Sequence, residues 1–94
     1  MGHKRIQNNL RLYRREMGLS QKEVAEILNL KSTGMISRWE KGIVLPDAVN
    51  ALKMAALYRS SVDAIYQNLR FILYDELSQR AKAVLQSRMA DEYE

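Results

Sequence analysis

The sequence contains no cysteine, a single proline and a single histidine, His3, and these scarcities exclude several classes of protein. Without cysteine there can be no disulfide framework, no thiolate metal site and no cysteine nucleophile. One histidine near the amino terminus leaves no cluster for zinc and no basis for histidine-dependent catalysis. We therefore expect no metal, no cofactor and no enzymatic activity.

Long apolar runs are missing as well. No stretch approaches the roughly 20 apolar residues that cross a bilayer, and no segment has the pattern of a secretory signal. We therefore expect a cytoplasmic location and no membrane partner. Hydrophobic residues still make up 47% of the 94 residues, which is enough for one buried core.

The net charge of +4 is unevenly distributed along the chain. Residues 1–60 contain eleven Lys and Arg against five Asp and Glu, whereas residues 61–94 contain four against six. A basic region joined to a mildly acidic tail is typical of a head that binds a polyanion and a tail with a separate role.

Apolar residues recur with helical spacing, and no segment alternates like a strand, so the predicted fold is all-α. Ile6, Leu10, Tyr13 and Met17 indicate a first helix, which Gly18 ends.

The next two helices have clear end signals. Ser20 and Glu23 form a predicted capping box at the start of the second helix, and Asn29 is a suitable left-handed terminator. The third helix is predicted to begin at Ser32 or Thr33 and to end at a glycine, residue 42.

Pro46 and Asp47 begin a predicted fourth helix, and Ser60 or Ser61 caps a fifth. The tail, residues 71–94, has no Gly or Pro and predicts a long amphipathic helix, either separate from the fifth or continuous with it. Its apolar stripe is formed by Leu69, Ile72, Leu73, Leu77, Ala81, Val84 and Leu85.

Two short helices joined by a turn in a basic region are typical of a helix-turn-helix that binds DNA. Gln21 and Lys22 lie in the first turn of the second helix, where free amides and the helix dipole favour a phosphate. On the third helix Arg38 has the side chain that binds guanine in a bidentate manner. The base-reading candidates are Thr33, Gly34, Ser37 and Arg38. The phosphate candidates are Gln21, Lys22, Lys31, Ser32 and Lys41.

The segment from about Ile6 to Tyr66 resembles the Cro/C1-type helix-turn-helix family, whose fold is the phage-repressor-like domain of five helices. The matching motifs are Gly18-Leu19-Ser20-Gln21, Val24-Ala25, the run from Ile36 to Gly42, Pro46 and Ser61-Val62-Asp63. The resemblance implies that Gln21 clamps the DNA backbone and that Arg14 and Glu40 form an internal ion pair. The turn before Ile36 is one residue longer than is usual in that family.

Several side chains have a structural alternative. Trp39 fits the core as well as a platform for stacking bases. Lys4, Arg11 and Arg15 fit a solvated helix face as well as phosphate contacts. The tail helix can dimerise or fold back on its own domain.

We therefore expect a DNA-binding domain over residues 1–69 and a dimerisation element over residues 70–94. The predicted function is a sequence-specific transcriptional regulator, a repressor, which binds a palindromic operator in double-stranded DNA as a homodimer. The alternative is an antitoxin-like protein-interaction module. Its C-terminal helix and the apolar loop 43–45 would bind a protein partner, with DNA binding for autoregulation.

Overall fold

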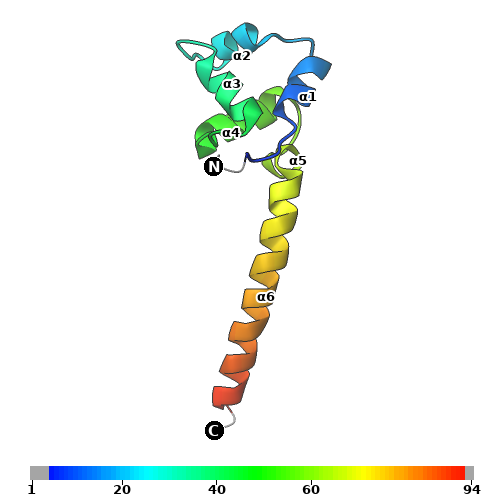
Figure 1. The fold of residues 1–94 in the computed structure, drawn as a ribbon, viewed down its shortest axis with the longest axis vertical. Helices are drawn as coiled ribbons and strands as arrows, with labels where there is room; N and C mark the ends of the chain where they lie inside the picture. The colour runs from blue at the N-terminus through cyan, green and yellow to red at the C-terminus, as the bar shows by residue number, and fades with distance from the viewer. Residues whose placement is uncertain (1–4, 93–94) are drawn as a thin grey trace.

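The structure, a computed structural model, describes residues 5–92, with side chains to residue 89; His3 and Lys4 lie outside these residues. Figure 1 shows five short helices gathered into a bundle, from which a sixth projects as one long helix. The described part of the chain contains no strand, which confirms the all-α prediction. The helices are α1 (Leu10–Glu16), α2 (Gln21–Ile27), α3 (Gly34–Lys41), α4 (Ala48–Leu57), α5 (Val62–Ile65) and α6 (Gln67–Glu92).

The bundle has one hydrophobic core, to which each of the first five helices contributes. The five most deeply buried side chains, none more than 1% exposed, come one from each helix: Leu10, Val24, Ile36, Met54 and Ile65. Truncating a large buried side chain of this kind costs about 2–5 kcal/mol. The five helices therefore depend on one another for stability.

The segment before α1 is not helical, so the prediction that Ile6 belongs to the first helix is wrong. The Ile6 amide donates to the Gly42 carbonyl at 3.0 Å. Asn8 Nδ2 donates to two carbonyls in the last turn of α3, at 3.0 and 3.4 Å. Asn8 Oδ1 also accepts from the Leu10 amide at 3.0 Å, so this side chain satisfies the start of α1 while it holds the segment against α3.

The ends of α2 follow the sequence signals. Ser20 Oγ accepts from the Glu23 amide at 3.0 Å, and the Glu23 carboxylate accepts from the Ser20 amide at 2.8 Å, which confirms the capping box. These bonds lower the pKa of Glu23 below its ordinary value, because they favour the charged carboxylate. Gly18 and Asn29, the predicted terminators, both have left-handed backbones, with φ of 73° and 63°.

The later helices begin at two of the predicted caps. Asp47 accepts from the Asn50 amide at 2.8 Å at the start of α4. Ser61, rather than Ser60, caps α5 by accepting from the Ala64 amide at 3.0 Å. Each bond satisfies an amide that has no partner within its own helix.

α6 is separate from α5, because the backbone departs from helical angles at Tyr66, with φ −111° and ψ 44°. Leu69 packs against the core, but the residues that follow lead away from the bundle (Figure 1). Ile72 and Val84 are 59% and 66% exposed, so the tail does not fold back on its own domain. Among the described residues no helix combines the length and the apolar character needed to cross a membrane.

Candidate nucleic-acid interface

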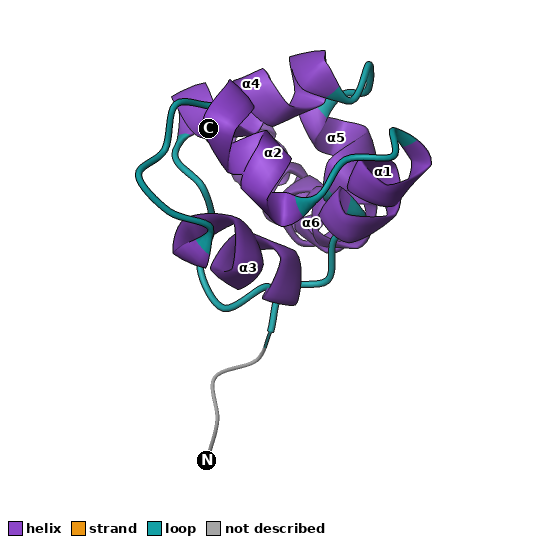
Figure 2. Ribbon diagram, turned by 90° about the horizontal axis from the view of Figure 1, so that it is seen from above, coloured by secondary structure: helices purple, strands orange, loops and turns teal. Residues whose placement is uncertain are grey.

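The turn between α2 and α3 spans residues 28–33, and Figure 2 shows that it leaves α3 at the periphery of the bundle. At its end Ser32 Oγ accepts from the Gly34 amide at 3.4 Å, whereas the Thr33 side chain caps nothing. Gly34 is therefore the first residue of α3, and a Cβ there would meet only Ser32 Oγ, at 3.6 Å. The helix starts with its backbone open to close approach.

α3 divides its residues between the core and solvent. Ile36 and Trp39 are 1% and 3% exposed, so Trp39 is a core residue rather than a stacking platform. Successive residues of an α-helix rotate by about 100°, which places four residues together on the side opposite this buried pair. These residues, each exposed or half-buried, are Gly34, Ser37, Arg38 and Lys41.

Arg38 lies at the centre of this outer side. Its guanidinium lies 4.0 Å from Met35 Sδ and forms no ion pair with any carboxylate of the described residues. Met35, which the sequence did not single out, is half-buried against the core and flanks the arginine stem. The positive charge of Arg38 is therefore available to an external ligand.

A buried ion pair links α1 to α3. Arg14 Nε lies 2.6 Å from Glu40 Oε2, and Arg14 Nη2 lies 3.1 Å from Glu40 Oε1. Arg14 Nη1 also donates to the Leu19 carbonyl at 2.9 Å. The two side chains are only 11% and 5% exposed, and the bond to Glu40 raises the pKa of Arg14. This bidentate pair holds the orientation of α3 against the rest of the bundle.

Gln21, the first residue of α2, has a partner inside the protein. Its Nε2 donates to Glu40 Oε1 at 3.0 Å, which occupies one of its two N–H groups. A hollow of about 530 Å³ opens beside it, bordered also by Arg11, Arg14, Ser37, Glu40 and Lys41. The Glu40 carboxylate is already paired with Arg14, so the other donors, which come from three helices, suit an anionic oxygen. From the sequence, Arg11 fits a solvated helix face as well as a phosphate contact.

The remaining candidates lie around this area without lining the hollow. Lys22 is exposed in the first turn of α2, and Lys31 and Ser32 are exposed in the turn before α3. The loop after α3 is apolar, and its residues 43, 44 and 45 are 53%, 39% and 47% exposed. Within the described residues no three His, Cys, Asp or Glu side chains gather closely enough to hold a metal ion.

Sequence reasoning missed Asn8, whose amide fixes the end of α3 from outside the helix. Its only signal is an asparagine two residues before the helical start, and that signal predicts a local cap rather than a bond across 31 positions.

A family model described as helix-turn-helix matches residues 10–65, more than half of the chain. The match runs from the first residue of α1 to the last residue of α5 and ends before α6. It includes α3, the hollow beside Gln21 and the buried ion pair. Comparisons with curated proteins and with solved structures found no match. The chain belongs to the Cro/C1-type helix-turn-helix family, a family of DNA-binding regulators.

Proposed function

We propose that the protein is a sequence-specific transcriptional repressor that binds a palindromic operator as a homodimer, with α3 in the major groove. The observation that carries this proposal is the outer side of α3, where Gly34, Ser37 and Arg38 lie opposite the buried Ile36 and Trp39. A helix with a small first residue can approach base edges closely, and an arginine in its middle can bind guanine O6 and N7.

Base contacts and backbone contacts have different residues in this proposal. Thr33, Gly34, Ser37 and Arg38 face the bases. The phosphates are contacted by Gln21, Lys22, Lys31, Ser32 and Lys41. The free N–H of Gln21 and the Lys41 ammonium share the hollow described above, so both can bind one phosphate between α2 and α3.

Two copies are needed because one recognition helix reads few base pairs and discriminates poorly. Two helices related by a twofold axis would read half-sites roughly 34 Å apart. The surface that supports dimerisation is the apolar side of α6, on which Leu73, Leu77 and Val84 are 44%, 57% and 66% exposed. We assign residues 70–94 to this role because a contiguous row of exposed apolar side chains is unusual on a monomer.

Selection of bound sequences from a random DNA pool tests the proposal as a whole. The expected product is an inverted repeat whose two halves are separated by about one helical turn. Enrichment of a single half-site would contradict the dimer, and a pool that stays random would contradict sequence-specific regulation.

Arg38→Ala is expected to weaken operator binding about tenfold to a hundredfold and to relax the preference at one base pair of each half-site. The reason is the loss of two hydrogen bonds to one guanine edge. Binding to the operator and to single-base variants measures both effects. Lys82→Ala is the matched control, because it removes an exposed positive charge from α6. That helix projects away from the bundle (Figure 1). Equal weakening on every DNA would instead mean that Arg38 touches only phosphate.

Lys22→Ala is expected to leave the sequence preference intact and to reduce the slope of log affinity against log salt by about 1. A lysine that neutralises one phosphate releases counterions, so its removal makes binding less dependent on salt. Titrations at several salt concentrations measure the slope, with Lys82→Ala again as the control. A slope equal to that of the unmodified protein would remove Lys22 from the backbone contacts.

Leu77→Asp is expected to convert the dimer into a monomer, because it places a charge on the apolar stripe at a position that is 57% exposed in one copy. Gln79→Asp adds the same charge two residues further, on the other side of α6, and is expected to remain dimeric. Solution mass measures both. A monomeric unmodified protein would contradict the homodimer and favour the antitoxin-like candidate, in which α6 and the apolar loop 43–45 bind another protein.

A further inference from the structure

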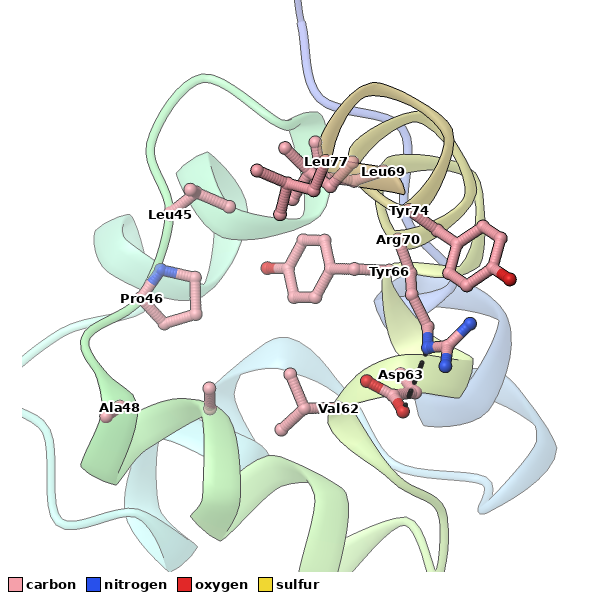
Figure 3. Close-up of a pocket in the computed structure, with 12 residues that line it drawn as sticks. Leu45, Pro46, Ala48, Val62, Asp63, Tyr66, Leu69, Arg70, Tyr74 and Leu77 are labelled. Atoms are coloured by element: carbon pink, nitrogen blue, oxygen red, sulfur yellow. Dashed lines mark ion pairs between the residues drawn. The ribbon is translucent and has the colours of Figure 1, made fainter. Parts of the chain in front are cut away.

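A groove runs between the bundle and the first turns of α6. Its volume is about 530 Å³, and most of the side chains that line it are apolar. In Figure 3, Leu45 and Pro46 form one side, Leu69 and Leu77 come from α6, and the Tyr66 ring lies between them. Asp63 and Arg70 form the polar rim, paired at 3.1 Å. The groove therefore continues the apolar stripe of α6 up to the bundle.

The far half of α6 has apolar side chains that its own copy does not cover. Val84, Leu85 and Met89 are 66%, 48% and 56% exposed. The helix has 26 residues and is about 39 Å long, and no Gly or Pro interrupts it. Because α6 points away from the bundle (Figure 1), these residues cannot reach the groove of their own copy.

We propose that the groove binds the far half of α6 from a second copy of this chain, so that the two α6 helices pair antiparallel. This inference depends on the proposed homodimer and adds its orientation. Each copy then provides one groove and fills the other, which is what a closed twofold interface requires.

The spacing of apolar residues supports an antiparallel register centred near residue 79. In that register, a residue that lies a given number of positions before residue 79 is level with the residue that lies the same number of positions after it in the other copy. Three apolar pairs coincide in this way. These are Leu73 with Leu85, Tyr74 with Val84, and Leu77 with Ala81. The last turns of one helix thus lie against the groove of the other copy.

The charges of α6 favour the same orientation. Residues 69–78 contain one basic and two acidic residues, whereas residues 80–89 contain three basic residues and no acidic one. Parallel helices would place the two basic halves together, whereas antiparallel helices place each basic half against the less basic one. The one unfavourable meeting, Arg70 with Arg88, is offset because Asp63 already pairs with Arg70.

Glu76 and Arg80 add a specific contact at the centre. They form an ion pair at 2.8 Å along one edge of the stripe. In an antiparallel pair the same edges of both helices meet, so Glu76 of each copy lies beside Arg80 of the other. Four charges of alternating sign then surround the twofold axis, an arrangement that fixes register as well as direction.

Disulfide trapping between single-cysteine variants tests the orientation, because the unmodified chain has no cysteine. Leu73→Cys and Leu85→Cys are made separately, mixed under reducing conditions and oxidised. In the antiparallel pair, covalent dimers form only in the mixture. Position 73 of one copy then lies about 18 Å along the axis from position 73 of the other copy. A disulfide spans a Cα separation of only about 7 Å, so a single variant cannot cross-link with itself.

A second pair keeps the test independent of the leucines. Arg70→Cys and Arg88→Cys remove no apolar contact, and they also face each other in this register. They are likewise expected to cross-link only when mixed. Solution mass and helical content of the reduced variants show that they fold and associate like the unmodified protein.

The other outcomes separate the two proposals. Cross-linking of each variant with itself, and not with its partner variant, would mean a parallel dimer and overturn the antiparallel inference while the homodimer stands. A dimer that traps neither pair would move the interface away from this face of α6 and overturn the inference in the same way. A monomeric unmodified protein would overturn the homodimer and this inference together.

Discussion

Gly42→Ala is expected to destabilise the protein by about 2–5 kcal/mol, one of the largest effects of any single methyl group in this chain. Gly42 ends α3 with φ of 73°, a conformation that costs a residue with a side chain about 1–2 kcal/mol. A Cβ would also lie 2.1 Å from the Ile6 carbonyl oxygen and 2.7 Å from the Ile6 nitrogen. Both atoms belong to backbone, so they cannot yield as the end of a flexible side chain would.

Gly18→Ala is the matched control for this substitution. Gly18 has the same φ of 73°, but a Cβ there would meet nothing within 4 Å. Gly18→Ala is therefore expected to lower the free energy of unfolding only by the conformational cost of about 1–2 kcal/mol. Urea unfolding of both variants measures the difference, which isolates the contact between the end of α3 and the segment before α1. Equal losses would show that this segment moves aside freely.

The Gly42 contact also illustrates why the start of the chain was predicted incorrectly. Ile6 has helical spacing to Leu10, and nothing local argues against a helix there. The non-helical path is fixed by bonds from Ile6 and Asn8 to the end of α3, more than 30 positions away. By contrast, the capping box of α2 and the left-handed Asn29 depend only on near neighbours, and their positions were predicted correctly.

In the candidate site, too, features that depend on near neighbours could be predicted from the sequence, whereas contacts between distant residues could not. Helical periodicity was enough to predict that Ser37 and Arg38 lie away from Ile36, because the burial of one side of a helix follows from its sequence. Periodicity was not enough to show that Gln21 bonds to Glu40, 19 positions further on, or that Arg11 borders the same hollow. The groove beside α6 likewise could not be predicted from the sequence, because it forms only where the loop after α3 meets the first turns of α6.

Glu40→Ala is expected to cost about 3–5 kcal/mol of unfolding free energy. The substitution leaves the Arg14 guanidinium, 11% exposed in the native pair, with only the Leu19 carbonyl as a partner. Leaving a buried charge without a counterion costs far more stability than losing the exposed pair of Asp63 and Arg70. Asp63→Asn is therefore the control, with an expected loss below about 1 kcal/mol, because those side chains are 72% and 59% exposed.

The double variant Arg14→Leu/Glu40→Leu separates stability from geometry. Two apolar side chains in place of a buried pair are expected to recover most of the lost stability, because no charge is then left without a partner. Operator affinity is expected to stay low, since the bidentate link between α1 and α3 and the bond from Gln21 to Glu40 are both gone. Urea unfolding and DNA titration on the same samples measure the two effects. Affinity that recovers together with stability would mean that packing alone orients α3. A double variant as unstable as Glu40→Ala would mean that the ion pair itself, rather than the avoidance of a lone buried charge, stabilises the bundle.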